Sequence, residues 1–114
     1  MKQGNNTLSE KKAFSMLGLA TRGGFVASGE FMTEQKVKEG KAVLVIVAEY
    51  ASDNTKKNFR YMCSFYHVPI LCFGTKETLG HAIGKELRAS LAVLNSGMAK
   101  TISDCITQSE QEGD

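Results

Sequence analysis

Residues 42–48 read Ala42-Val43-Leu44-Val45-Ile46-Val47-Ala48, an unbroken apolar run that is rich in β-branched side chains. Such a run is typical of a strand that is covered on both faces, because a strand with one solvated face alternates apolar and polar residues. We therefore expect residues 42–48 to form the central strand of a sheet with helices on both sides.

Shorter elements flank this strand in a regular alternation. Three more segments have the composition of short strands, at residues 25–28, 70–73 and 90–94. Helical patterns follow caps at Thr7 and Ser52, and a further helix follows Gly74-Thr75. Two more helices are expected at residues 30–39 and 98–107, and the first helix is expected to end near residues 18–22. The alternation predicts an α/β fold, a three-layer α/β/α sandwich around a small, mostly mixed four-stranded sheet.

Spacing within two of these helices predicts their packing. In the helix after Ser52, the side chains at i, i+3, i+4 and i+7 indicate one buried face, formed by Phe59, Met62, Cys63 and Tyr66. In the helix after Thr75, Gly80 and Gly84 lie four residues apart. A glycine costs about 1 kcal/mol relative to alanine inside a helix, so we expect this pair to allow a close approach of the helix to the sheet.

The charge is distributed unevenly along the 114 residues. Residues 1–100 contain all 14 lysines and arginines but eight of the 12 acidic residues, a net charge of +6, whereas the last 14 residues hold four acids and no base. The chain is long enough for one core and too short for two domains with a cleft between them. We expect a single domain at residues 1–107, followed by a short acidic tail that frays at residues 108–114. The basic body indicates a polyanionic partner.

Several function classes are not supported by any motif. No segment approaches the roughly 20 apolar residues of a membrane helix, and residues 1–7 lack the apolar core of a signal peptide, so we expect a cytoplasmic protein without a membrane partner. The residues 24–29 have the spacing of a phosphate-binding loop, but Glu30 and Phe31 follow where a nucleotide site needs Lys and Ser or Thr.

Metal and catalytic motifs are missing as well. The two histidines, His67 and His81, stand on different expected elements, and the three cysteines contain no C-x-x-C spacing. No nucleophile motif such as G-x-S-x-G is present. We expect a protein that is not an enzyme, without a cofactor or metal, whose cysteines are small buried hydrophobes.

Two segments have more specific features. Gly29 ends an expected strand and begins a helix, where backbone N–H groups and the helix dipole favour phosphate oxygens. An ordinary strand-to-helix turn, in which Glu30 complements the dipole, is the alternative interpretation. The second segment, Lys85-Glu86-Leu87-Arg88-Ala89-Ser90, is a short loop before the last strand with two cations, and by itself it is typical of a solvated loop.

Taken in order, these segments resemble the kink-turn-binding ribosomal protein family, in particular its short bacterial members. The likeness covers about residues 9–100 and depends on Leu17-Gly18-Leu19-Ala20, Arg22, Ser28-Gly29-Glu30, Lys38-Glu39-Gly40-Lys41-Ala42, Leu44 to Glu49, Val68-Pro69-Ile70, Glu77 to Lys85, and Arg88-Ala89-Ser90-Leu91-Ala92. The resemblance implies an α/β/α sandwich that binds structured RNA, ribosomal or other.

The resemblance also implies which residues contact RNA. In the family, the start of the second helix lies against a sharply bent RNA duplex, and the loop before the last strand packs on bases that have left the stack. By position, the RNA-facing residues are Gly29, Glu30, Phe31, Thr33 and Lys36, with Glu49 beside them and Arg88, Ala89 and Ser90 in the base-packing loop. We expect Arg22, Lys36 and Lys41 to contact phosphates.

At three positions the sequence departs from the family's motif. The motif has Asn, Glu and, one turn later, Lys, where this sequence has Phe31, Met32 and Gln35. Asn and Glu hydrogen-bond the sheared G·A pairs of a kink-turn, which Phe and Met cannot do. After Glu49 the family has an acidic residue, where this sequence has Tyr50. Two interpretations of Tyr50 remain: an aromatic that stacks on a base, or an ordinary surface tyrosine.

Phe31 and Met32 also leave a second hypothesis open, because apolar side chains at an exposed helix start are common at protein-binding surfaces. In this hypothesis the chain is a protein-interaction module of the translation or transcription machinery. Its partners are then ribosomal or transcription proteins, and it has lost kink-turn specificity.

Overall fold

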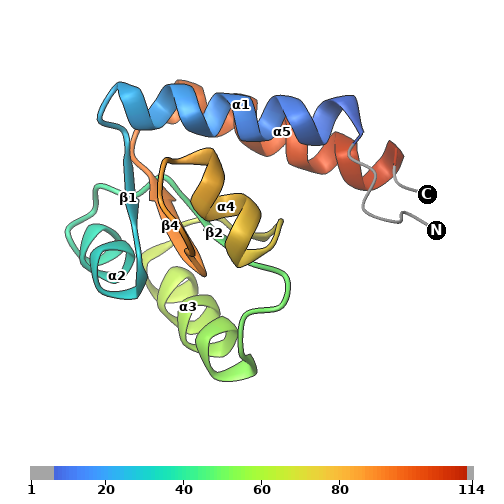
Figure 1. The fold of residues 1–114 in the computed structure, drawn as a ribbon. Helices are drawn as coiled ribbons and strands as arrows, with labels where there is room; N and C mark the ends of the chain where they lie inside the picture. The colour runs from blue at the N-terminus through green and yellow to red at the C-terminus, as the bar shows by residue number, and fades with distance from the viewer. Residues whose placement is uncertain (1–6, 113–114) are drawn as a thin grey trace.

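A computed structural model describes residues 7–112, in which helices and strands alternate around one sheet (Figure 1). In chain order the elements are α1 (Leu8–Arg22), β1 (Val26–Ser28), α2 (Glu30–Lys38), β2 (Leu44–Val47), α3 (Asp53–Tyr66), β3 (Ile70–Cys72), α4 (Lys76–Ala82), β4 (Ser90–Val93) and α5 (Ser96–Glu112). The predicted order of elements is confirmed. Each strand is shorter than predicted by one to three residues.

The sheet is mixed, with the strand order β1-β4-β2-β3. Strand β4 pairs antiparallel with both β1 and β2, and β2 pairs parallel with β3. Consequently β1, β2 and β3 end at the edge where β4 begins, and α2, α3 and α4 all begin there. We call this region the strand-end edge, formed by residues 28–32, 48–50, 74–76 and 85–90.

Helices cover both faces of the sheet, which confirms the predicted three-layer sandwich. Figure 1 shows α1 and α5 side by side on one side of the sheet, with α2 and α3 on the other. The hydroxyl of Ser9 in α1 donates to Glu112 Oε2 in α5 at 3.0 Å, so the two helices run antiparallel. Helix α4 packs against α1, where the Cβ of an alanine at Gly18 would lie 3.2 Å from the Ala82 carbonyl oxygen. None of the described helices is long and apolar enough to cross a membrane.

The core is centred on the strand predicted to be central. Every residue of β2 is at most 2% exposed, and β4 is buried to the same degree. Helices add buried side chains from both sides, among them Leu17, Val37, Phe59, Leu79 and Ile102. The hydrophobic effect at about 25 cal/mol per Å² of buried apolar surface makes this two-sided burial of the sheet the main stabilising term.

Predictions about individual buried side chains are partly wrong. Phe59 and Cys63 are buried in α3, and burial raises the pKa of the Cys63 thiol to about 11. Tyr66, predicted on the same buried face, is 38% exposed. It is the last residue of α3, and the chain turns away at His67, whose φ is 59°. Cys72 is only half-buried, unlike the other two cysteines.

The predicted fraying of the acidic end is wrong for residues 108–112. Helix α5 continues to Glu112 rather than ending near Thr107, while residues 113–114 lie outside the described residues. Ser109 is 7% exposed, and its hydroxyl donates to the Ile106 carbonyl at 2.7 Å. The reason is tertiary: the first turns of α1 cover the end of α5, which a local sequence pattern cannot show.

This correction gives a first prediction. Changing Ser109→Asp should lower the free energy of unfolding by about 1–3 kcal/mol, because it places a charge in a site closed by α1. Urea unfolding followed by circular dichroism measures the change. The matched control is Gln111→Asp, the same added charge on an exposed position of α5, which should stay within about 0.5 kcal/mol. Equal, small effects of both changes would show that this turn is not packed.

Candidate nucleic-acid interface

Backbone hydrogen bonds join the four strands at the strand-end edge. The Gly29 N–H donates to the Ser90 carbonyl at 3.0 Å, the Ala48 N–H to the Ala89 carbonyl at 2.8 Å, and the Glu49 N–H to the Gly74 carbonyl at 2.8 Å. In the order of the sheet, these bonds connect the ends of β1, β4, β2 and β3. The start of α2, the loop before β4 and Glu49 therefore form one continuous surface.

Arg88 links this surface to the elements beside it. Its Nε donates to Ser28 Oγ at 3.0 Å, and its terminal nitrogen donates to the Leu87 carbonyl at 2.7 Å. The backbone N–H of Arg88 donates to the Lys76 carbonyl at 3.0 Å. The structure therefore brings Gly29 and Arg88 together at one edge, because Ser28, which Arg88 contacts, directly precedes Gly29.

The start of α2 is open to a ligand. Gly29 has φ 91° and ψ 158°, a backbone conformation that other residues rarely adopt. Thr7, Ser52 and Thr75 cap α1, α3 and α4 with their side chains, whereas no side chain caps α2. The first N–H groups of α2 and the positive end of its dipole can therefore interact with an anion or a base acceptor atom.

Exposed apolar side chains surround this helix start. Phe31 is 75% exposed, Tyr50 82%, Leu87 52% and Met32 40%. Such side chains offer flat surfaces on which unpaired bases can stack. The predicted site residues Glu30 and Glu49 are exposed among them. The sequence analysis did not select Leu87. Its position between Lys85 and Arg88 in the same loop could have indicated an exposed contact residue.

Two predicted RNA-facing side chains are buried instead. Thr33 is 0% exposed and Ser90 is 1% exposed, so direct contact of either side chain with RNA is excluded. Thr33 lies on the side of α2 that packs on the sheet, and its hydroxyl has no hydrogen-bond partner among the described residues. Ser90 is the first residue of an interior strand and contributes its carbonyl, which accepts from Gly29.

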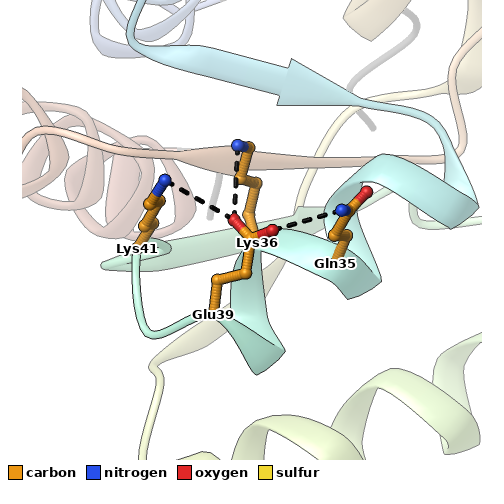
Figure 2. Close-up of polar contacts among 4 residues, drawn as sticks. All are labelled: Gln35, Lys36, Glu39 and Lys41. Carbon is orange, nitrogen blue, oxygen red and sulfur yellow. Dashed lines mark hydrogen bonds and ion pairs between the residues drawn. The ribbon is translucent and has the colours of Figure 1, made fainter.

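Three predicted phosphate-binding cations lie away from this edge. Figure 2 shows Lys36 and Lys41 converging on Glu39, with Nζ to Oε1 distances of 3.4 Å and 3.8 Å. The carbonyl of Lys36 accepts from the Lys41 N–H at 3.0 Å, which places both residues near the start of β2. Arg22 ends α1, just before the start of β1. The structure thus places Arg22, Lys36 and Lys41 toward the opposite ends of the strands, away from Gly29.

The Glu39 carboxylate partly neutralises Lys36 and Lys41. Desolvation opposes ionisation of the Glu39 carboxyl, but the charges of Lys36 and Lys41 and hydrogen bonds from Lys36 and Gln35 outweigh it. The pKa of Glu39 is therefore lowered, and its carboxylate forms ion pairs with both ammonium groups.

Other cations are closer to the strand-end edge than these. Five other cations belong to the segments that form this edge or to the helices that begin there: Arg88, Lys85, Lys76, Lys56 and Lys57. Within residues 7–112, none of these five makes an ion pair of 4.0 Å or less. Sequence reasoning missed the lysines at the starts of α3 and α4. Their position in the sequence could have identified them, because each helix follows a strand that ends at this edge.

Gly80 fixes the loop that carries Arg88. The loop runs back along α4, and the Lys85 N–H donates to the Gly80 carbonyl at 2.8 Å. A Cβ at position 80 would lie 2.7 Å from the Glu86 carbonyl carbon and 3.0 Å from the Leu87 nitrogen. The predicted close approach exists, but it is to this loop rather than to the sheet. Gly84 lies beyond the end of α4 in open space and has no part in it.

These features define a small α/β/α domain with a basic and aromatic edge built from helix starts and one loop. Residues 11–103 match the model of the ribosomal protein L7Ae/L30e/S12e/Gadd45 family, and the chain belongs to that family. The resemblance found in the sequence is thereby confirmed.

Individual relatives cover nearly the whole chain. The RNA-binding protein YlxQ of Bacillus subtilis (strain 168) is 37% identical over 95 residues, which are 83% of this chain and 95% of that protein. The RNA-binding protein YlxQ of Enterococcus faecium is 34% identical over 106 residues, 93% of this chain and 98% of that protein.

Solved structures show the same fold. A protein of unknown function from Bacillus halodurans has a TM-score of 0.81 at 33% identity, over 84% of this chain and 97% of that one. The 15.5kD RNA binding protein of Giardia lamblia has a TM-score of 0.73 at 18% identity, over 93% and 91% of the two chains.

The contact at Gly80 gives a second prediction. Changing Gly80→Ala should lower the free energy of unfolding by about 1–3 kcal/mol and move the backbone amide resonances of residues 84–89, because the added methyl group overlaps the loop backbone. Gly97→Ala is the control, since a Cβ there meets only the Asn95 side chain at 3.4 Å. Resonance changes in residues 84–89 no larger than those of the control would contradict the proposed contact.

Proposed function

We propose that this chain is a non-catalytic, cytoplasmic RNA-binding protein that holds structured RNA, ribosomal or other, with a kink-turn-like bend against the strand-end edge. The observation that carries the proposal is the direct joining of an uncapped helix start to the Arg88 loop across one sheet edge. Two relatives that cover most of the chain are named RNA-binding proteins, which supports it.

Phosphates are bound in this proposal by two kinds of group. The first N–H groups of α2 donate to phosphate oxygens, and Arg88, Lys76 and Lys85 supply positive charge nearby. Double-helical RNA has a major groove too narrow for side chains, so a protein reads its shape, its phosphates and its unstacked bases. A rigid edge held by backbone hydrogen bonds suits that mode of recognition.

Bases are recognised mainly by stacking. Phe31, Tyr50 and Leu87 are exposed side chains of three segments that form the strand-end edge, where unstacked bases of a bent RNA can pack. Phe31 and Met32 cannot hydrogen-bond G·A pairs, as the Asn and Glu of the family's motif do. We therefore infer that the chain binds bent RNA with a weaker requirement for G·A pairs than that motif imposes.

Salt dependence gives the third prediction. RNA affinity, measured by filter binding with a bent ribosomal RNA fragment, should fall linearly with salt on a log–log plot. Arg88→Ala and Lys76→Ala should each weaken binding and reduce the slope by somewhat under one unit, because each removes one phosphate contact. The control Lys100→Ala removes an exposed cation from α5 that is paired with Asp104 at 3.1 Å. An equal loss in all three variants, or salt-independent binding, would contradict the assignment.

The departures from the family's motif give the fourth prediction. The double change Phe31→Asn and Met32→Glu should increase discrimination between a kink-turn duplex with tandem G·A pairs and the same duplex with Watson–Crick pairs by about tenfold, through restored base-edge hydrogen bonds. Isothermal titration of both duplexes measures the ratio. A wild-type protein that already discriminates as strongly as the variant would show that Phe31 and Met32 do not limit specificity.

The exposure of Phe31 and Met32 favours one second candidate, a protein-interaction module on the ribosome or the transcription machinery. Affinity purification with and without ribonuclease separates the two functions. A partner that stays bound after digestion supports the module, whereas partners lost on digestion support RNA binding.

A further inference from the structure

Helices α2 and α3 lie on the side of the sheet away from α1 and α5 (Figure 1). Side chains of both helices line a groove between them. Its volume is about 310 Å³, and its walls include Glu30, Glu34, Asn58, Tyr61, Phe65 and Tyr66. Three of these side chains are exposed aromatics: Tyr61 is 77% exposed, Phe65 68% and Tyr66 38%. Their exposure adds little to the core, and grouped exposed apolar side chains are typical of a binding surface.

We propose that this groove binds an unpaired base of a single-stranded RNA segment that flanks the structured RNA at the strand-end edge. The proposal rests on the RNA-binding function proposed above, and it adds a second site that shares Glu30 with the strand-end edge.

The chemistry of the walls fits a nucleobase. Aromatic rings stack on bases of any sequence, and the Phe65 and Tyr66 rings are already held edge to face with centroids 4.9 Å apart. The Glu30 and Glu34 carboxylates accept hydrogen bonds, and the Asn58 amide both donates and accepts. Unpaired bases are recognised in RNA complexes by this combination of stacking and edge contacts.

Glu34 is held in place for this role. Lys38 Nζ donates to Glu34 Oε2 at 2.8 Å, and this hydrogen bond raises the pKa of Lys38. The ion pair fixes the position of the Glu34 side chain at the wall of the groove, which Lys38 lines as well. Lys38 and Asn58 add donors to the same walls, so the preference among bases comes from stacking, and the larger adenine ring is favoured over uracil.

Helix α3 brings positive charge to the outer side of the groove. Its 14 residues contain three cations, Lys56, Lys57 and Arg60, and one acid, Asp53. Arg60 lies on the side of α3 toward β3, where its Nη2 donates to Cys72 Sγ at 3.7 Å. Lys57 makes no ion pair among the residues that the structure describes. Lys57 stands one helical turn before Tyr61, on the same exposed face. Phosphates can therefore follow the outer side of α3 while the base points toward α2.

The groove is also continuous with the strand-end edge. Glu30 is both a wall residue and the first residue of α2, directly after Gly29. Helix α3 begins at the same edge, so an RNA strand leaving the edge reaches the groove without crossing another element.

The test compares one RNA hairpin with an internal loop, with and without a single-stranded oligo(A) extension of about eight nucleotides, a length within the range of known single-strand sites. Fluorescence anisotropy gives the Kd of each RNA. The extension should tighten binding of the wild-type chain about tenfold, and an oligo(U) extension should give a smaller gain. Tyr61→Ala and Phe65→Ala should lose the gain while binding the unextended hairpin normally.

Matched variants keep the two proposals separable. Tyr61→Phe retains the ring and should retain the gain, whereas Arg88→Ala should weaken both RNAs by the same factor. An extension that helps the wild type and Tyr61→Ala equally, or not at all, overturns the groove site while leaving the edge intact. If neither RNA binds, both proposals fail. A Tyr61→Ala chain that binds both RNAs like the wild type but loses a ribonuclease-resistant protein partner also overturns the groove site, in favour of a protein occupant.

Discussion

The position of β4 between β1 and β2 is the constraint on which the rest of this structure depends. Because β4 runs antiparallel to both neighbours, its first residues meet the last residues of β1, β2 and β3. Only this arrangement joins Gly29 to Ser90 and Ala48 to Ala89 by backbone hydrogen bonds. These bonds join the start of α2 and the Arg88 loop into one rigid surface, although Gly29 and Arg88 are 59 residues apart in the chain.

Sequence reasoning was most successful where the signal is local. The buried run at residues 42–48, the alternation of elements and the caps at Thr7 and Ser52 all predicted what the structure contains. It failed where packing between distant segments decides the outcome. Ser109 is buried because α1 covers it, and Gly80 is a glycine because a loop, not the sheet, touches it.

The family resemblance placed Gly29 and Arg88 correctly, whereas the expected phosphate-binding cations were placed less accurately. Gly29 and Arg88 do meet, but Lys36 and Lys41 pair with Glu39 near the other end of the sheet. A count of cations cannot separate those that already have an acidic neighbour from those that do not. Topology does separate them, since the cations at the starts of α3 and α4 are brought to the edge by the strands that precede them.

The central claim is that RNA lies on the strand-end edge and not on the cation cluster around Glu39. Amide chemical shifts recorded during titration with a bent RNA fragment test this claim most directly. The account predicts the largest shifts at residues 29–32, 49–50, 74–76 and 85–89, with residues 22, 36 and 41 nearly unchanged. The largest shifts at residues 22, 36 and 41, with an unchanged edge, would contradict it.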